Sequence, residues 1–394
     1  MTVARETKTG TARPPFWRDV KVLRIVAQLV AGAGSVALLW YLGSNLTTNL
    51  TAQGISTDFG FLDQPAGVTV PGSDFRSSQP ISDILVLGIK NTFALVIVGI
   101  PLLTILGTLI GIGRLSSNWL VRKAATAYVE TLRNIPPLLV IIFTNTAVIL
   151  ASLPRIQEAW QPFDLFVLSN RELAVPWFTA GDGSGAYLGV LAAGVVASIA
   201  VWIWRTRQFD ATGTPHHRFF WGTGVFLLFA VVGFFVIGNP YSLSRPELEG
   251  LVITGGISNI SAYFAVLLAL VIYTASHVAE IVRGSIQAVA KGQTEAANAL
   301  ALSSFQRLRF VVLPQAFRIA IPPLINQFLN FTKNSSLAIA IGYSEITLVV
   351  FQAIGNGQPA PQLIIILMGA YLLFSLSISL LINILNRRLQ LVTN

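Results

Sequence analysis

Residues 292–300 read GQTEAANAL, residues 313–318 read LPQAFR, and residues 332–337 read TKNSSL. The first segment predicts a short amphipathic helix, and the last lies inside an otherwise apolar span. Basic residues surround the first segment, at Arg283, Lys291, Arg307 and Arg309. Because cytoplasmic loops of membrane proteins are enriched in Lys and Arg, we expect this helix on the cytoplasmic side, after which the chain re-enters the bilayer.

The composition is that of an integral membrane protein. Of 394 residues, 53% are hydrophobic and only 11% are charged, against about 25% charged in soluble domains. The net charge of +9 comes from basic residues in short loops between apolar runs, which argues against nucleic acid as a partner. The chain has no cysteine and three histidines. Neither a disulfide framework nor a Cys or His metal site is therefore expected.

Apolar runs of near-spanning length predict an all-α membrane bundle of about eight transmembrane helices. They fall at 22–43, 88–112, 134–152, 186–204, 219–238, 259–282, 315–341 and 363–386. The first is too long for a cleaved signal peptide, so we predict an uncleaved helix. Basic and acidic loops alternate along the chain, which predicts that both termini are cytoplasmic.

The segment from Glu295 to Pro314 resembles the cytoplasmic EAA loop of ATP-binding cassette (ABC) importer permeases. That loop reads E-A-A, three residues, G, nine residues, I, one residue, L-P. Here Glu295, Ala296 and Ala297 open it and Leu313 and Pro314 close it at the same spacing, with Gly292 just before it. The glycine position holds Ala301. Since Ala favours a helix over a turn, a milder bend is expected there.

Three further segments resemble the polar amino acid branch of the same family. Residues 128–138 read YVETLRNIPPL, residues 280–284 read EIVRG, and residues 333–337 read KNSSL. The long insert resembles that of the Aap/Bzt-type general L-amino acid systems. The resemblance implies a permease subunit that translocates polar L-amino acids across the bacterial inner membrane.

The resemblance also implies an organisation and a set of partners. The expected parts are a cytoplasmic tail (1–21), an extra first helix (22–43), an external polar segment (44–86), a type 1 ABC transmembrane domain (87–386) interrupted at about 153–258 by an insert with two extra helices, and a cytoplasmic tail (387–394). The expected partners are two ATP-binding subunits, a sister permease completing a heterodimer, a periplasmic amino acid-binding protein and membrane lipid. No lysine follows a glycine, so a Walker A loop is absent, and ATP and Mg²⁺ are expected on the partner subunits.

Polar side chains inside the seventh span are the candidates for a substrate pathway. They are Asn326, Gln327, Asn330, Lys333, Asn334, Ser335 and Ser336. A charged group such as Lys333 costs about 2.5–3.5 kcal/mol at mid-membrane and normally pairs or lines a water-filled path. Two other readings stay open: that Lys333 reaches the external interface, and that the amides join helices. For Glu130, Arg133, Glu280 and Arg283, both gate ion pairs and ordinary interface charges remain open.

Other function classes fit the sequence less well. An ion-coupled secondary amino acid transporter is the main alternative, but such proteins favour inverted repeats and buried mid-membrane carboxylates, and neither stands out here. A scaffold without transport would not need the polar groups of the seventh span. An enzyme is not expected, because the chain shows no nucleophile–His–acid set.

Overall fold

The computed structural model describes residues 15, 17, 19–52, 54, 58–213 and 217–389, with side chains to residue 384. Most of both predicted tails, and His216, lie outside these residues. Among the described residues, seven helices are long and apolar enough to cross a membrane, or eight if one bent pair counts as a span. The prediction of an all-α membrane bundle of about eight helices is confirmed.

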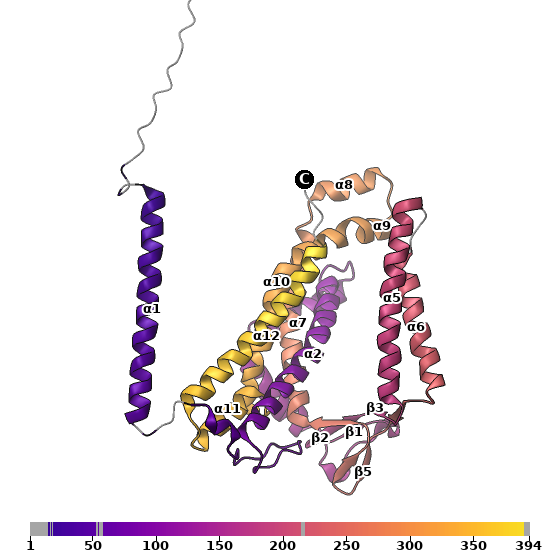
Figure 1. Cartoon of the computed structure of the whole chain (residues 1–394). Coiled ribbons are helices and arrows are strands. Elements are labelled where there is room, and N and C mark those ends of the chain that lie inside the picture. The colour runs from indigo at the N-terminus through magenta and orange to yellow at the C-terminus, as the bar shows by residue number, and fades with distance from the viewer. Residues whose placement is uncertain are drawn as a thin grey trace, which may run out of the picture.

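Helix α1 (Val20–Ala52) stands apart from the rest of the protein (Figure 1). None of its residues is buried. Its 33 residues extend about 50 Å at 1.5 Å per residue, well beyond the roughly 30 Å of a bilayer core. The helix therefore continues past the predicted span 22–43 into the start of the predicted external polar segment (44–86).

The central bundle is built around α7 (Ser261–Gln287). In an apolar stretch of 18 residues of α7, 61% of the stretch is buried inside the protein. The corresponding value for α2 (Ile81–Gly113) is 28%. Helices α10 (Leu313–Asn334) and α12 (Ala360–Leu389) complete the bundle. One apolar core joins α2, α7 and α10 around Leu95, Leu270 and Phe331. A second core joins the start of α2 to α11 (Ile346–Gly355) and the 3₁₀ turn η1 (Gly60–Asp63).

The predicted span 134–152 is shorter than expected and is bent away from its neighbour. Helix α3 (Trp119–Arg133) ends before the two prolines, and α4 (Pro137–Phe143) continues as the π-helical segment η2 (Thr144–Leu150). The two halves are bent by 105°. Pro136 is extended, with φ −59° and ψ 137°, because a residue before a proline avoids the helical region. Pro136 and Pro137 thus begin α4 and turn it away from the direction of α3.

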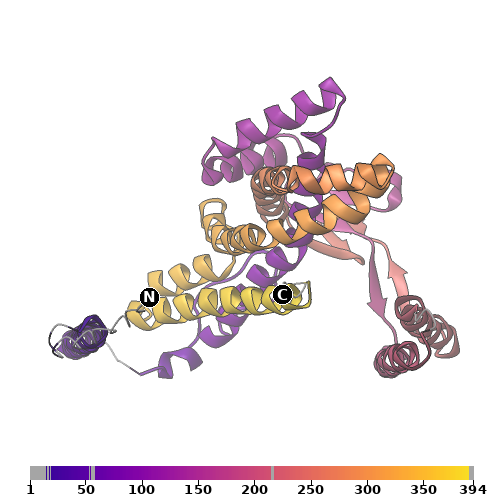
Figure 2. The same cartoon turned by 90° about the horizontal axis from the view of Figure 1, so that it is seen from above.

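The insert forms a helical hairpin on a base of short strands. Helices α5 (Ser184–Thr212) and α6 (Arg218–Val236) lie side by side and apart from the bundle (Figures 1 and 2). Seven strands of the described part of the chain lie at one end of the molecule: β1 (Val167–Leu168), β2 (Glu172–Val175), β3 (Trp177–Ala180), β4 (Tyr241–Ser244), β5 (Glu247–Glu249), β6 (Val252–Thr254) and β7 (Ile257–Ile260). They pair antiparallel in the orders β1-β2-β7, β3-β4 and β5-β6. We call this end the strand end.

The opposite end carries α8 (Lys291–Ala299) and α9 (Ser304–Arg307) (Figure 1). We call it the α8 end. From α9 the chain passes through the π-helical segment η5 (Leu308–Val312) directly into α10, and after α10 it tightens into the 3₁₀ segment η6 (Ser335–Ile341). The strand end also holds two further 3₁₀ turns, η3 (Ile156–Glu158) and η4 (Pro162–Asp164).

Candidate functional site

Helix α8 forms a protruding surface at one end of the molecule (Figure 1). Gly292, Glu295 and Ala296 are exposed, whereas Ala297 is buried with 2% of its surface accessible. The amphipathic helix expected from the sequence is present. Its free face carries small side chains and one carboxylate, a combination that allows another protein to approach the backbone closely.

Two side-chain hydrogen bonds tie α8 to the helical rod that follows it. The amide of Gln315 in α10 donates to Gln293 Oε1 at 3.0 Å, and Arg307 Nη1 in α9 donates to Asn298 Oδ1 at 2.6 Å. Because α9, η5 and α10 run on without a break, these two hydrogen bonds join α8 to one continuous helical segment.

The turn after α8 differs from the expected mild bend. Ala301 has a left-handed φ of 54°. The amide of Leu302 donates to Ala297 O at 3.1 Å, and the amide of Ala301 donates to Asn298 O at 2.9 Å. This is the Schellman pattern that normally ends in glycine. The prediction from helix propensity was wrong because the two capping hydrogen bonds and the need to turn into α9 outweigh the preference of one residue.

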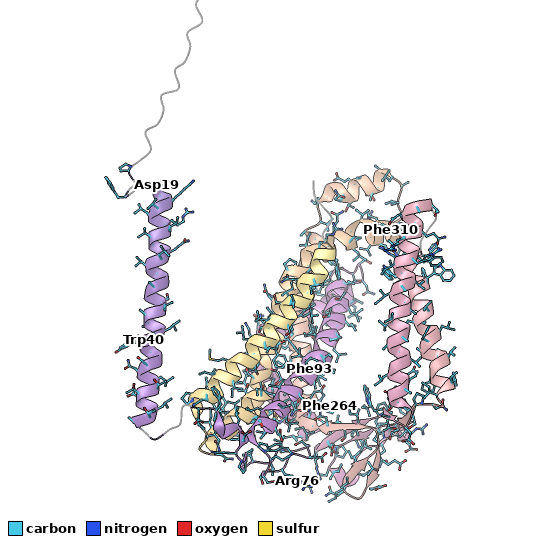
Figure 3. The ribbon with its side chains drawn as sticks, in the orientation of Figure 1. Asp19, Trp40, Arg76, Phe93, Phe264 and Phe310 are labelled. Atoms are coloured by element: carbon cyan, nitrogen blue, oxygen red, sulfur yellow. The ribbon has the colours of Figure 1, made fainter. Side chains whose placement is uncertain are left out.

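Leu313 and Pro314 lie where η5 passes into α10, and both are exposed. Proline cannot donate a backbone hydrogen bond and its ring crowds the preceding turn. A π-helical turn just before Pro314 widens the helix where that donor is missing. Phe305 and Phe310 are exposed nearby, with the Arg309 guanidinium 6.0 and 5.8 Å from their ring centroids. Figure 3 shows Phe310 close to the α8 end.

Three of the predicted pathway residues share one exposed face of α10. Asn326, Asn330 and Lys333 follow one another at intervals of four and three residues, and all three are exposed. Residues at this spacing are neighbours on a helix surface. Gln327 and Asn334 are half-buried beside them. The five residues therefore form one polar stripe, which we call the α10 stripe.

The two serines of the predicted pathway form hydrogen bonds within the protein. Ser335 is fully buried; its hydroxyl donates to Thr332 O at 2.7 Å and lies 3.4 Å from the hydroxyl of Tyr371. Ser336 donates to the carbonyl of Lys333 at 2.8 Å. The chain changes from α to 3₁₀ geometry at Ser335. The spacing that aligns polar residues along one face of α10 therefore does not continue through these two serines.

A buried carboxylate beside Ser335 was not singled out from the sequence. Glu345 has no exposed surface. It accepts hydrogen bonds from Tyr371 Oη at 2.8 Å, from Thr347 Oγ1 at 3.2 Å, and from the amides of Thr347 and Leu348 at 2.8 and 3.2 Å. The last two cap the N-terminus of α11, where a negative charge is favoured. A Glu just before an apolar helix was the only available signal.

The charged residues near the α8 end of the bundle meet around one carboxylate. Glu280 in α7 forms ion pairs with Arg114 at the end of α2 and with Arg283, and Arg133 in α3 lies 3.9 Å from it. Glu130 remains exposed. This cluster ties three helices together.

One groove in the bundle is apolar. It has a volume of about 510 Å³ and lies between α2, α7, α10 and α12, lined by residues such as Phe317, Leu324 and Ile382. A polar solute would leave its hydrogen-bonding groups unpaired there, at a cost of about 1–3 kcal/mol each. The α10 stripe, not this groove, has the chemistry for a polar ligand. The described residues contain no group of three metal-ligating side chains.

The sequence matches a known family and is similar to curated proteins over nearly its full length. Residues 103–391 match the family described as "Binding-protein-dependent transport system inner membrane component". The General L-amino acid transport system permease protein AapQ of Rhizobium johnstonii is 40% identical over 387 residues, covering 98% of this chain and 96% of AapQ. The Glutamate/glutamine/aspartate/asparagine transport system permease protein BztB of Rhodobacter capsulatus is 36% identical over 408 residues, covering 95% of each.

The family match covers well over half of the chain, and the similarity to AapQ extends through α1 and the insert. The bundle of apolar helices agrees with a component that spans the membrane. This chain therefore belongs to the family of inner membrane components of binding-protein-dependent transport systems, as a transport subunit rather than an enzyme.

Proposed function

We propose that this chain is the permease subunit of an ABC importer for polar L-amino acids, and that α8 couples it to a separate ATP-binding subunit. The observation that carries the proposal is the exposed, small-residue face of α8 around Glu295, joined by hydrogen bonds to α9 and α10. Movement of a partner against α8 is then transmitted along the continuous helix 304–334. That helix carries the α10 stripe.

The α10 stripe is the proposed substrate pathway. Lys333 is exposed within a span of 38 residues that begins at Ser304. A charge facing lipid there would cost about 2.5–3.5 kcal/mol. Facing a water-filled path shared with a sister permease, it instead offers a cation for the carboxylate of an amino acid, while Asn326 and Asn330 offer amide groups. Alternating access would expose this stripe to one side of the membrane at a time.

The partners follow from the same proposal. Two ATP-binding subunits hold ATP and Mg²⁺, a sister permease completes the pore, and a periplasmic binding protein delivers the substrate. The names of AapQ and BztB, which describe amino acid transport, support this substrate class. The basic loops near α8 favour a cytoplasmic α8 end, with both chain termini on that side. The strand end is then periplasmic.

Transport into vesicles tests the class. The chain is reconstituted with the products of its neighbouring genes, and uptake of labelled glutamate, glutamine and histidine is measured with and without ATP inside. Uptake that needs both internal ATP and an external binding protein is expected. Uptake by this chain alone, driven by an ion gradient, would instead identify an ion-coupled secondary transporter.

Glu295→Lys tests the coupling role. The side chain is exposed, so folding and membrane insertion should be unchanged, while ATP-dependent uptake should be lost because the charge at the partner contact is reversed. The control is Asp210→Lys, which also replaces a carboxylate with an ammonium group, at an exposed site near the α8 end of α5, and for which uptake near the wild-type rate is expected. Full uptake by the Glu295 variant would remove α8 as the coupling element.

A further inference from the structure

The α5–α6 hairpin is exposed on most of its surface. Within Ser184–Thr212 and Arg218–Val236 three residues are buried, and all are glycines: Gly194, Gly222 and Gly233. Each lies where its helix meets the other; a Cβ at Gly194 would be 2.8 Å from Phe229, and one at Gly233 would be 2.5 Å from Val190. Since both helices qualify as membrane spans, their remaining faces are available to lipid.

At the α8 end of this hairpin, two arginines lie against three tryptophans. The guanidinium of Arg205 is 5.7 Å from the ring centroid of Trp204 and 5.5 Å from that of Trp221. The guanidinium of Arg218 is 5.2 Å from the ring centroid of Trp202. We call these five residues the Trp/Arg cluster. Such contacts are worth about 0.5–1 kcal/mol each at exposed sites, and they hold the two cations close to the tryptophan rings.

An apolar groove runs along α6 from this cluster. It has a volume of about 390 Å³ and is lined by Phe220, Trp221, Gly224, Val225 and Leu228. Phe220, Gly224 and Leu228 are four residues apart and lie along one face of the helix. A Cβ at Gly224 would have no heavy atom within 4 Å, so the glycine leaves a notch in that face. The groove meets the cluster at Trp221.

The charge at this end is positive. Between residues 202 and 221 the sequence contains Arg205, Arg207 and Arg218 against Asp210, a net charge of +2 with His neutral. Arg is the side chain best suited to phosphate, because its planar fork can donate two parallel hydrogen bonds. An apolar groove that ends in a cationic cluster matches a molecule with an acyl chain and an anionic phosphate.

We propose that this hairpin binds an anionic phospholipid, with one acyl chain in the groove at Gly224 and the phosphate headgroup at the Trp/Arg cluster. Tryptophans at a span end also serve as general interface anchors. Such an anchor holds a helix at a depth but does not select a headgroup or need a notch. Selectivity for an anionic lipid and dependence on Gly224 therefore define the site, and both are independent of what the protein transports.

Quenching of tryptophan fluorescence by brominated lipid tests the site. The chain is placed in vesicles of equal parts phosphatidylcholine and phosphatidylglycerol, with bromines on the acyl chains of one lipid or the other. We expect stronger quenching when phosphatidylglycerol carries the bromines. Gly224→Leu fills the notch and should bring the ratio of the two quenching values close to one. Gly189→Leu is the matched control, since Gly189 lies on α5 of the same hairpin with no heavy atom within 4 Å of an added Cβ, and it should keep the wild-type ratio.

Arg218→Gln tests the headgroup end. One arginine near an anionic surface contributes about 1 kcal/mol, so its loss should lower the apparent preference for phosphatidylglycerol about fivefold. Inorganic phosphate should lower the wild-type ratio no more than chloride of equal ionic strength; a specific effect of phosphate would mean a free-anion site and overturn the proposal. If the two brominated lipids quench the wild-type protein equally, the Trp/Arg cluster is a general interface anchor and the proposal is wrong. Crosslinking of the chain in the same vesicles covers one further outcome. If wild-type copies crosslink to each other and Gly224→Leu copies do not, while the ratio of the two quenching values is unchanged, the groove binds a helix of a second copy and the lipid proposal is wrong.

Discussion

A single alanine holds the turn on which the proposed coupling surface depends. Ala301 takes the left-handed conformation with φ 54°, which costs an L-residue about 1–2 kcal/mol. It is kept there by the two Schellman hydrogen bonds to the end of α8. The strain is offset by the capped carbonyls and by the direction that the turn imposes on α9, whose capping box at Ser303 and Gln306 begins two residues later.

Ala301→Gly should make this turn more stable. Glycine removes the left-handed strain but adds freedom to the unfolded chain, so we expect a net gain of about 0.5–1 kcal/mol. Hydrogen exchange of the amides of residues 297–302 measures it as slower exchange. Ala299→Gly, a glycine in the last helical turn of α8, should show the opposite change. Faster exchange in the Ala301 variant would mean that the turn is not strained.

Lys333 is the residue on which the proposed pathway depends. We expect Lys333→Met to raise the KM for uptake by about tenfold or more, since a hydrogen bond to a charged group contributes about 1.5–3 kcal/mol. Ser336→Ala, three residues away, should leave KM unchanged because its hydroxyl bonds the backbone of its own helix. Concentration-dependent uptake in vesicles distinguishes the two. An unchanged KM for Lys333→Met would remove this side chain from the pathway.

At the scale of helices, α2 and α7 approach closely through small residues. Gly107 and Gly111 are four residues apart on α2 and face α7, where a Cβ would lie 2.9 Å from Ala275 O and 2.7 Å from Ala279 O respectively. In membranes helices associate by close packing, without the hydrophobic effect that operates in water, so small residues at the contact are favoured. This contact places α7 at the centre of the bundle.

Gly107→Ala should therefore weaken the bundle. The nearest atoms include a backbone carbonyl, which cannot move aside as a side chain can, so we expect a loss of about 1–3 kcal/mol in the free energy of unfolding. Gly284→Ala in α7 has nothing within 4 Å of the added Cβ and should gain about 0.5–1 kcal/mol from helix propensity. Unfolding of the purified chain in a mixed-detergent titration compares the two. Equal stability of the two variants would contradict close packing at Gly107.

At the scale of the whole molecule, the two ends differ in character. The α8 end carries the ATPase-facing surface that we propose and the Trp/Arg cluster. The strand end carries three small sheets and the loop that contains Arg76 (Figure 3). A transport subunit must present different partners at its two sides. The orientation of the chain is therefore the most informative global property to measure.

Single cysteines can map this orientation, because the chain has none of its own. Ser78→Cys, exposed at the strand end, should react with a membrane-impermeant maleimide in intact spheroplasts. Leu300→Cys, 75% exposed after α8, should react only after the membrane is opened. Ala192→Cys, exposed on α5 within a span, should stay unlabelled in both conditions. The reverse pattern for the first two would place α8 outside and exclude coupling to a cytoplasmic ATPase.

The membrane bundle, the approximate positions of its spans and the spacing of the loop from Glu295 to Pro314 can all be predicted from the order of the amino acids. These properties are local: a run of apolar residues buries its backbone polar groups by forming a helix, whatever its neighbours are. Which side chains meet, by contrast, depends on how the helices pack. Packing buries Ser335 beside Tyr371, whose hydroxyl donates to Glu345, holds Ala301 in a left-handed turn, and pairs β2 with β7 although the α5–α6 hairpin separates them in the chain. Such contacts depend on residues far apart in the chain, whose approach is set by packing and by the need to pair every buried polar group.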